Sequence, residues 1–146
     1  MALDQVQDPQ NLGSICRTAE CVGAAGVVIP ERRSAEVTPA VCKASAGAVE
    51  HLPVARVRNM ADFLADARRV GCWSYGASAP EADEASGGDG PLVRYDEPDY
   101  QGAGIVLVLG SEGAGLRPRV AGRWPSCRRR AGLPASSPAG RQHHCR

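Results

Sequence analysis

The sequence predicts an α/β domain built around a parallel sheet, and two observations support that prediction. Apolar stretches suited to buried strands alternate with stretches of helical periodicity along most of the chain. The run Ile105–Leu109 has five apolar residues without a polar break, which is typical of a strand buried on both faces of a parallel sheet. Glycines follow it at positions 110, 113 and 115. A strand that ends in such a turn lets the backbone approach a ligand at the carboxyl edge of a sheet, where its strands end.

The other elements are expected in regular alternation from the amino terminus. Apolar residues recur at helical spacing from Leu12 to Gly23, and Asn11 stands where a helix N-cap belongs. A later helix has Asn59 as its cap and an apolar face that includes Met60 and Leu64. In order, we expect a strand at 3–6, a helix from position 11, a strand at 26–30, a helix at about 38–48, a strand at 51–57, a helix after position 59, a strand at 72–76, and an acidic, Gly- and Pro-rich surface loop at 80–102 before the strand at 105–109.

The pattern fails in the last part of the chain. From Arg117 to Arg146 there is no apolar period of either kind, only a mixture rich in Arg, Pro, Ala, Gly and Ser. An α/β sheet needs a helix to cover the strand that precedes it, and no helical pattern follows here. We therefore expect an organised domain over residues 1–118 and an irregular Arg/Pro-rich tail over residues 119–146.

Composition limits the classes of protein that the chain can belong to. At 146 residues it is one domain with a net charge of +1, which argues neither for nor against a nucleic-acid partner. The six cysteines have no C-x-x-C spacing and no secretory signal precedes them, so reduced thiols and a cytoplasmic location are expected. No metal site is expected, since His143, His144 and Cys145 form a lone cluster, and no apolar run is long enough to cross a membrane.

The glycine-rich segment after the central strand allows more than one interpretation. Its order is G-x-x-G-x-G rather than the dinucleotide fingerprint G-x-G-x-x-G, and no Gly-Lys-Ser/Thr follows, which excludes a P-loop. Glu112 inside the segment would repel a phosphate by about 1 kcal/mol at 4 Å in bulk water. The segment therefore suits a ligand that is neutral or cationic at this point. The alternative is a plain strand-to-helix turn, in which the glycines only allow the chain to turn tightly.

Two residues near the amino terminus are further candidates for a functional site. Arg17 lies five residues after Leu12, so it points away from the apolar stripe toward solvent or a cleft. Asn11 precedes the same helix. The alternatives are an N-cap role for Asn11 and a solvated surface position for Arg17.

Two motifs together resemble a known family. Residues 8–19, Asp-Pro-Gln-Asn-Leu-Gly-Ser-Ile-Cys-Arg-Thr-Ala, resemble the first motif of the SpoU/TrmH family of RNA ribose 2′-O-methyltransferases, within the SPOUT superfamily. Residues 107–116, Leu-Val-Leu-Gly-Ser-Glu-Gly-Ala-Gly-Leu, resemble its second motif. Shorter stretches at 28–30, 34–35 and 44–48 match as well, most closely in the 23S rRNA guanosine branch. The resemblance covers about residues 3–118.

This resemblance implies a parallel-sheet α/β-knot domain that binds S-adenosylmethionine in a deep trefoil knot and works on RNA as a homodimer. Asn11 and Arg17 would face the target ribose, with Arg17 as the catalytic arginine, and Glu112 would help to hold that arrangement. Leu109, Gly110 and Gly115 would contact the cofactor. Arginine has a pKa above about 12, so phosphate anchoring or stabilisation of the developing alkoxide by Arg17 is as plausible as proton abstraction.

The family's third motif, an Ile-Pro-Met/Leu-x-Gly segment running into Ser-Leu-Asn-Val-Ser, is not found. It should begin near position 130, where Arg128–Ser137 stands instead, as a shifted reading frame in GC-rich DNA would produce. Because the first motif stands almost at the start of the sequence, we also expect the chain to lack the amino-terminal RNA-binding module common in the branch. The sequence therefore predicts an RNA methyltransferase domain whose knot is incomplete, whose activity is defective and whose dimer is weakened. The alternatives are an inactive fragment that at most binds RNA through its arginine-rich tail and, more distantly, a nucleotide-binding regulatory domain.

Overall fold

The structure, a computed structural model, describes residues 1–78, 92–94, 104–111, 116–117, 120 and 128–130. Helices and strands alternate along the first 78 residues, and short strands follow in the later described parts. The elements are β1 (Ala2–Leu3), α1 (Pro9–Cys21), β2 (Val27–Pro30), α2 (Pro39–Ala44), the 3₁₀ helix η1 (Ala48–Glu50), β3 (Val54–Val57), α3 (Met60–Arg69), β4 (Trp73–Ser78), β5 (Leu92–Arg94), β6 (Ile105–Leu109) and β7 (Arg128–Arg130).

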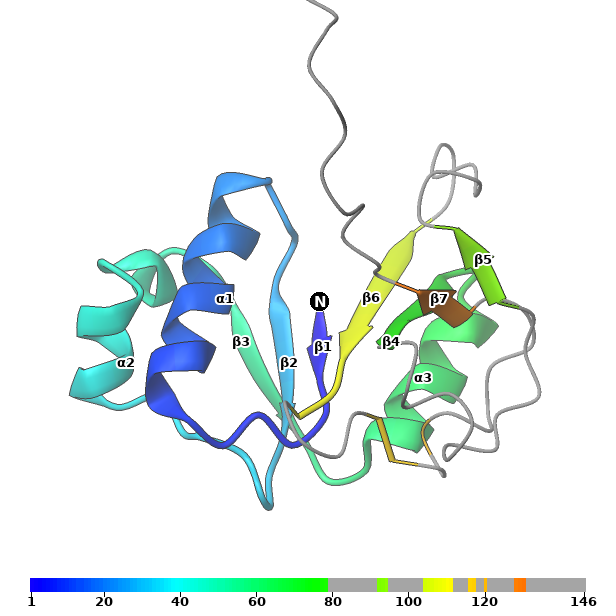
Figure 1. The fold of residues 1–146 in the computed structure, drawn as a ribbon, viewed down its shortest axis with the longest axis horizontal. Coiled ribbons are helices and arrows are strands. Elements are labelled where there is room, and N and C mark those ends of the chain that lie inside the picture. The colour runs from blue at the N-terminus through cyan, green and yellow to red at the C-terminus, as the bar shows by residue number, and fades with distance from the viewer. Residues whose placement is uncertain (79–91, 95–103, 112–115, 118–119, 121–127, 131–146) are drawn as a thin grey trace, which may run out of the picture.

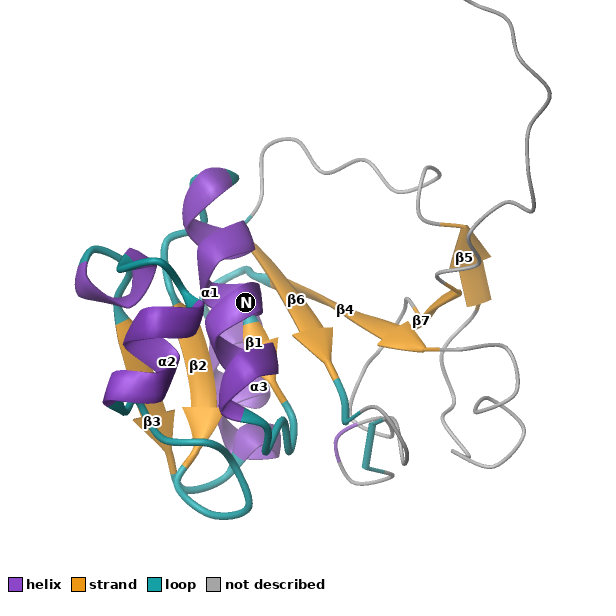
Figure 2. Ribbon diagram, turned by 60° about the vertical axis from the view of Figure 1, so that its left-hand side comes forward, coloured by secondary structure: helices purple, strands orange, loops and turns teal. Residues whose placement is uncertain are grey.

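The described strands form one parallel sheet in the order β3-β2-β1-β6-β4-β7-β5. Helices α1 and α2 cover one face of this sheet, and α3 covers the other (Figures 1 and 2). The run Ile105–Leu109 is the middle strand, β6, with β1 and β4 as its neighbours. The predicted parallel α/β class is therefore confirmed. Strands β1, β2, β3 and β6 end toward the lower edge of Figure 1, which is the carboxyl edge of this part of the sheet.

Helix α1 begins earlier than the sequence suggested. Its N-cap is Asp8, whose side chain accepts a hydrogen bond from the backbone N–H of Gln10 at 2.9 Å, and Pro9 follows in the first turn. The assignment of Asn11 as N-cap was therefore wrong, because Asp8 supplies the capping oxygen and leaves Asn11 inside the first turn. Leu12, Cys16 and Ala19 are buried, as the apolar stripe predicted.

Helix α2 lies unusually close to α1. A Cβ atom built on Gly13 would stand 2.5 Å from the Cβ of Ala44 and 2.9 Å from the backbone nitrogen of Ser45. The helix is also shorter than the predicted span of 38–48. It ends at Ala44, because Ala46 and Gly47 adopt left-handed conformations with φ of 51° and 85° before η1 begins.

Replacing Gly13 by alanine is expected to lower the free energy of unfolding by about 1–3 kcal/mol, because the added methyl group must push α2 away from α1. Urea denaturation followed by circular dichroism measures the loss. Ser14→Ala, at an exposed neighbouring position of the same helix, is the matched control and should stay within about 0.5 kcal/mol of the wild type. Equal stability of the two variants would contradict the close helix contact.

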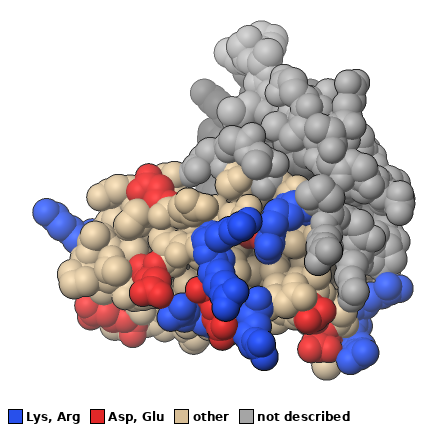
Figure 3. Space-filling model, turned by 90° about the horizontal axis from the view of Figure 1, so that it is seen from below, with Lys and Arg blue, Asp and Glu red and all other residues tan. Residues whose placement is uncertain are grey.

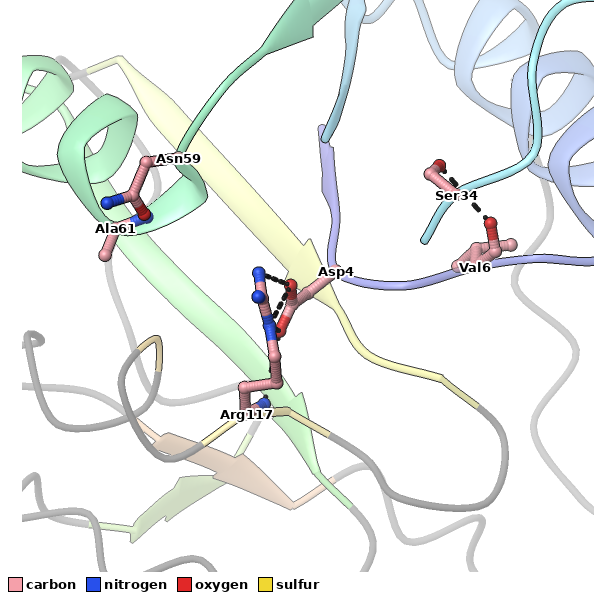
Figure 4. Close-up of polar contacts among 6 residues, drawn as sticks. All are labelled: Asp4, Val6, Ser34, Asn59, Ala61 and Arg117. Atoms are coloured by element: carbon pink, nitrogen blue, oxygen red, sulfur yellow. Dashed lines mark hydrogen bonds and ion pairs between the residues drawn. The ribbon is translucent and has the colours of Figure 1, made fainter. Parts of the chain in front are cut away.

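Helix α3 agrees with its prediction. The side chain of Asn59 accepts a hydrogen bond from the backbone N–H of Ala61 at 3.0 Å, which confirms the cap (Figure 4). Met60 and Leu64 are buried against the sheet. The buried apolar cluster on this face is formed by residues from several distant segments, namely Ala2, Met60, Leu64, Val108, Leu116 and Val120.

Several strand predictions need correction. The first strand was expected at 3–6 and is β1 at 2–3. The third was expected at 51–57 and is β3 at 54–57, and the fourth was expected at 72–76 and is β4 at 73–78. The middle strand is not buried along its whole length, since Val108 is fully buried but Ile105 at its start is 39% exposed. Strand β5 lies in the predicted surface loop, and β7 lies in the predicted irregular tail. Parallel pairing uses backbone groups alone, so a strand of three arginines can form without any apolar pattern.

Candidate active site

The connections that follow β1, β2 and β6 meet at the carboxyl edge, and hydrogen bonds to backbone carbonyls join them. The segment after β1 receives two hydrogen bonds from the segment after β2: the N–H of Ala35 and the hydroxyl of Ser34 both donate to the carbonyl of Val6, at 2.9 and 3.3 Å (Figure 4). It also bonds to the end of β6, where the N–H of Asp4 donates to the carbonyl of Leu109 at 2.7 Å. The segment that leads into the first motif and the start of the second motif are thus adjacent in space.

The structure places four of the six predicted site residues. Leu109 and Gly110 lie half-buried at the end of β6, and Asn11 lies half-buried in the first turn of α1. Arg17 is exposed, as its position outside the apolar stripe predicted. Glu112 and Gly115 lie outside the described residues.

The positions of Asn11 and Arg17 on one helix limit what they can do together. Six residues of α-helix separate them by about 9 Å along the axis and by about a third of a turn around it. Asn11 stands at the end of α1 that lies near the carboxyl edge, whereas Arg17 lies further along the helix, away from that edge (Figure 1). A contact of both side chains with the same group would therefore need the long side chain of Arg17 to span most of that distance.

A buried ion pair at this edge was missed by the sequence reasoning. The carboxylate of Asp4 is completely buried, and the side chain of Arg117 pairs with it through Nε at 2.9 and 3.1 Å and Nη2 at 2.5 Å (Figure 4). The backbone N–H of Arg117 also donates to Asp4, at 3.2 Å. The available signal was an aspartate next to the apolar residues of the first strand, since a buried carboxylate needs a partner.

The carboxyl edge also carries exposed positive charge. Arg32 and Arg33 follow β2, Arg58 follows β3, and all three are exposed. Arg56 is paired with Glu36 at 3.1 Å. Figure 3, which views the molecule from this edge, shows Lys and Arg side chains gathered near the middle with acidic ones beside them. Such guanidinium groups suit phosphate oxygens as ligands.

Other chemistry has little support in the described part of the chain. Burial raises the pKa of the Cys16 thiol, which makes it a poor nucleophile, and the four described cysteines are free thiols. Among the described residues there is no group of three or more His, Cys, Asp or Glu side chains that could hold a metal ion. None of the helices described is both long and apolar enough to span a membrane.

A parallel α/β domain with a glycine-rich segment at the end of its middle strand defines a class of ligand-binding domains. Comparison with known proteins identifies the family within that class. The sequence model of the SpoU rRNA methylase family matches residues 1–134, and the chain belongs to this family. The matched range extends past residue 118, where we had expected the organised domain to end.

Individual relatives agree with the family assignment. The chain is 44% identical over 116 residues to YacO of Bacillus subtilis, which is assigned to the TrmH family of tRNA/rRNA methyltransferases; the match covers 80% of this chain and 42% of the relative. A relative from Staphylococcus haemolyticus, assigned to the same family, is 45% identical over 114 residues, 78% of this chain and 41% of the relative. The chain therefore spans less than half the length of these relatives.

Solved structures support the fold. An AdoMet-bound rRNA methyltransferase from Sinorhizobium meliloti superposes with a TM-score of 0.74 at 29% identity, covering 95% of this chain and 49% of that one. The SpoU methyltransferase AviRb from Streptomyces viridochromogenes, in complex with AdoMet, gives a TM-score of 0.68 at 25% identity, over 94% and 53% of the two chains. The fold is therefore the parallel α/β fold of SPOUT methyltransferases. The expected knot region lies mostly outside the described residues.

Proposed function

We propose that this chain is the catalytic domain, or part of it, of an S-adenosylmethionine-dependent RNA ribose 2′-O-methyltransferase. The observation that supports this most directly is the hydrogen bond between Asp4 and Leu109, which brings the start of the second family motif next to the segment that leads into the first. Family membership and the AdoMet complexes of two structural relatives support the cofactor.

The described residues fit such a cofactor. The half-buried Leu109 provides apolar surface and Gly110 provides backbone that can be approached closely, both at the edge where open α/β sheets bind ligands. Gly115 and Glu112 would complete this side of the site, with the carboxylate of Glu112 facing a cationic neighbour. The cofactor supplies an activated methyl group, so the protein has to bind and orient the RNA and to assist loss of the 2′-hydroxyl proton.

Asn11 and Arg17 would act on the RNA. Arg17 is exposed and therefore accessible to a phosphate or ribose, as proton acceptor, phosphate anchor or stabiliser of the developing alkoxide. The exposed arginines at the carboxyl edge would add contacts to the RNA backbone, which are salt-dependent and not sequence-specific. We propose 23S rRNA as the substrate, because the motifs match that branch most closely, and the cytoplasm as the location.

Methyl transfer from labelled S-adenosylmethionine to ribosomal RNA, by a version of the chain that carries a complete third motif, tests this function. A 2′-O-methyl group blocks alkaline cleavage of the adjacent phosphodiester, so a labelled, alkali-stable dinucleotide is the expected product. Label found on a base, and not on the ribose, would contradict ribose methylation.

The second candidate function is RNA binding without catalysis. It is favoured by Arg128–Arg130, which stands where the third motif should begin and forms strand β7 instead of carrying an Ile-Pro sequence. In that case RNA would bind with a steep salt dependence while no methyl group is transferred.

We also expect the chain to dimerise only weakly. Family dimers depend partly on a carboxyl-terminal helix, and the sequence after residue 120 has no amphipathic period. Analytical ultracentrifugation should find mainly monomer at low micromolar concentration. A stable dimer under these conditions would show that another surface suffices for association.

A further inference from the structure

Asp4 contacts both sides of the glycine-rich segment, and no motif of the sequence accounts for this. Its backbone N–H donates to the carbonyl of Leu109, just before the segment, at 2.7 Å. Its carboxylate accepts hydrogen bonds from the backbone and side chain of Arg117, just after the segment, at 2.5–3.2 Å. One residue at the end of β1 therefore joins the two ends of residues 110–116.

The surroundings of this contact are rigid on both sides. β6 is held by parallel pairing with both β1 and β4, and Val108 is completely buried. On the other side Leu116 and Val120 are buried in the same apolar cluster as Val108. The N–H of Val120 also donates to the carbonyl of Arg117 at 2.9 Å. The ion pair lies between two anchored segments of the chain, and it fixes the distance between them.

A buried ion pair is a weak source of stability, because the cost of removing two charges from water offsets most of their attraction. Its main effect is geometric, since the planar guanidinium fixes the direction from which Arg117 approaches the carboxylate. The side chain of Arg117 stays 41% exposed, so its charge is only partly removed from water, whereas Asp4 has no contact with solvent. An arrangement of this kind specifies the position of a segment more than it stabilises the whole fold.

We propose that Asp4 and Arg117 are positioning residues that set the spacing of the two ends of the glycine-rich segment, and thereby the shape of the cofactor site. The role of the site rests on the proposed function. Neither residue is proposed to touch the cofactor or RNA. They act through Leu109, Gly110 and Leu116, whose backbone they hold in place.

The test is residue-resolved hydrogen exchange by NMR on the full chain, which needs no cofactor. In Asp4→Asn and in Arg117→Gln, the backbone amide of residue 117 is expected to exchange about tenfold faster or more. The first change removes the carboxylate that accepts its hydrogen bond, and the second removes the guanidinium that holds this carboxylate in place. The amides of Leu12 and Val27, which bond to Asp8 and Pro53 away from the pair, should exchange at the wild-type rate. The double variant should exchange no faster than the faster single variant, since both changes break the same interaction.

Two further variants sharpen the result. Arg117→Lys retains the charge but loses the planar pair of donors, so it should recover only part of the protection. Arg69→Gln removes the exposed pair with Asp66 and should leave every one of these amides unchanged. Faster exchange throughout the sheet would make the pair a general stabiliser and overturn the proposal, as would unchanged exchange at Arg117.

Cofactor is added only in a separate arm. S-adenosylmethionine at millimolar concentration should shift the amide signals of Gly110 and Leu116 in the wild type. The same addition is made to a chimera whose residues after Arg119 are replaced by a family-like third motif. Unshifted signals in that chimera would count against the proposed function, while the exchange rates without cofactor still decide the role of Asp4 and Arg117.

Discussion

Replacing Arg17 by alanine is expected to reduce RNA methylation at least about a hundredfold without changing the fold. Loss of a group that moves a proton or stabilises a developing charge typically costs two to four orders of magnitude. Arg17 is exposed on α1, and surface substitutions of this kind change stability by about 0.5 kcal/mol or less. The measurement is single-turnover methylation of RNA, in a chain that carries a complete third motif, with thermal denaturation alongside.

Arg68→Ala is the matched control for this experiment. Arg68 is also an exposed arginine, near the end of α3 on the opposite face of the sheet, so it tests for a general loss of positive charge. It should retain most of the wild-type rate. Comparable rates for Arg17→Ala and Arg68→Ala would remove Arg17 from the proposed active site.

Arg17→Lys separates the roles that remain open for the residue. Lysine keeps the positive charge, so a phosphate anchor should retain part of the activity at neutral pH. If the residue accepts a proton, the rate should instead rise with pH toward the ordinary lysine pKa of about 10.4, because only the neutral amine is a base.

The sequence was most informative where elements are long and apolar. The period of α1, the cap and apolar face of α3 and the unbroken run of β6 each predicted the element that the structure contains. These patterns reflect burial against a large surface, because buried positions are occupied by apolar residues at a regular spacing. The error at the start of α1 arose because Asp8 and Asn11 are both good caps, and only the geometry decides between them.

What the sequence could not predict depends on contacts between distant residues or on backbone pairing alone. Asp4 and Arg117 are 113 positions apart, and no local pattern links them. Leu116 and Val120 are four residues apart and both buried, but two apolar residues are too few to reveal a period. Strand β7 consists of three arginines and is held through its backbone by β4 and β5.

The site was predicted by resemblance more than by pattern. The glycines after β6 indicated a ligand at the carboxyl edge, and the structure places Gly110 there. The roles of Asn11, Arg17 and Glu112 came only from the matching motifs and stay predictions. Helix geometry adds one constraint that the motif does not contain, namely the separation of about 9 Å between Asn11 and Arg17 along α1.

The second large effect concerns the affinity for S-adenosylmethionine, and it depends on residues 120–146. A cofactor site of this size normally buries most of the ligand's surface. Leu109, Gly110 and Gly115 would supply one side of the proposed site, and the residues of the family's third motif, which would supply the other, are not found in the sequence. Loss of half the lining costs several kcal/mol, and at 1.4 kcal/mol per tenfold this weakens binding by about a hundredfold or more.

We therefore expect the chain as it stands to bind S-adenosylmethionine in the millimolar range or not at all. A chimera whose residues after Arg119 are replaced by a family-like third motif should bind at least about a hundredfold more tightly. A second chimera with the same motif in scrambled order is the control for added length and composition. Isothermal titration calorimetry of all three proteins compares them directly. Micromolar binding by the unmodified chain would refute the prediction, because it would require residues 120–146 to complete the cofactor site without the third motif.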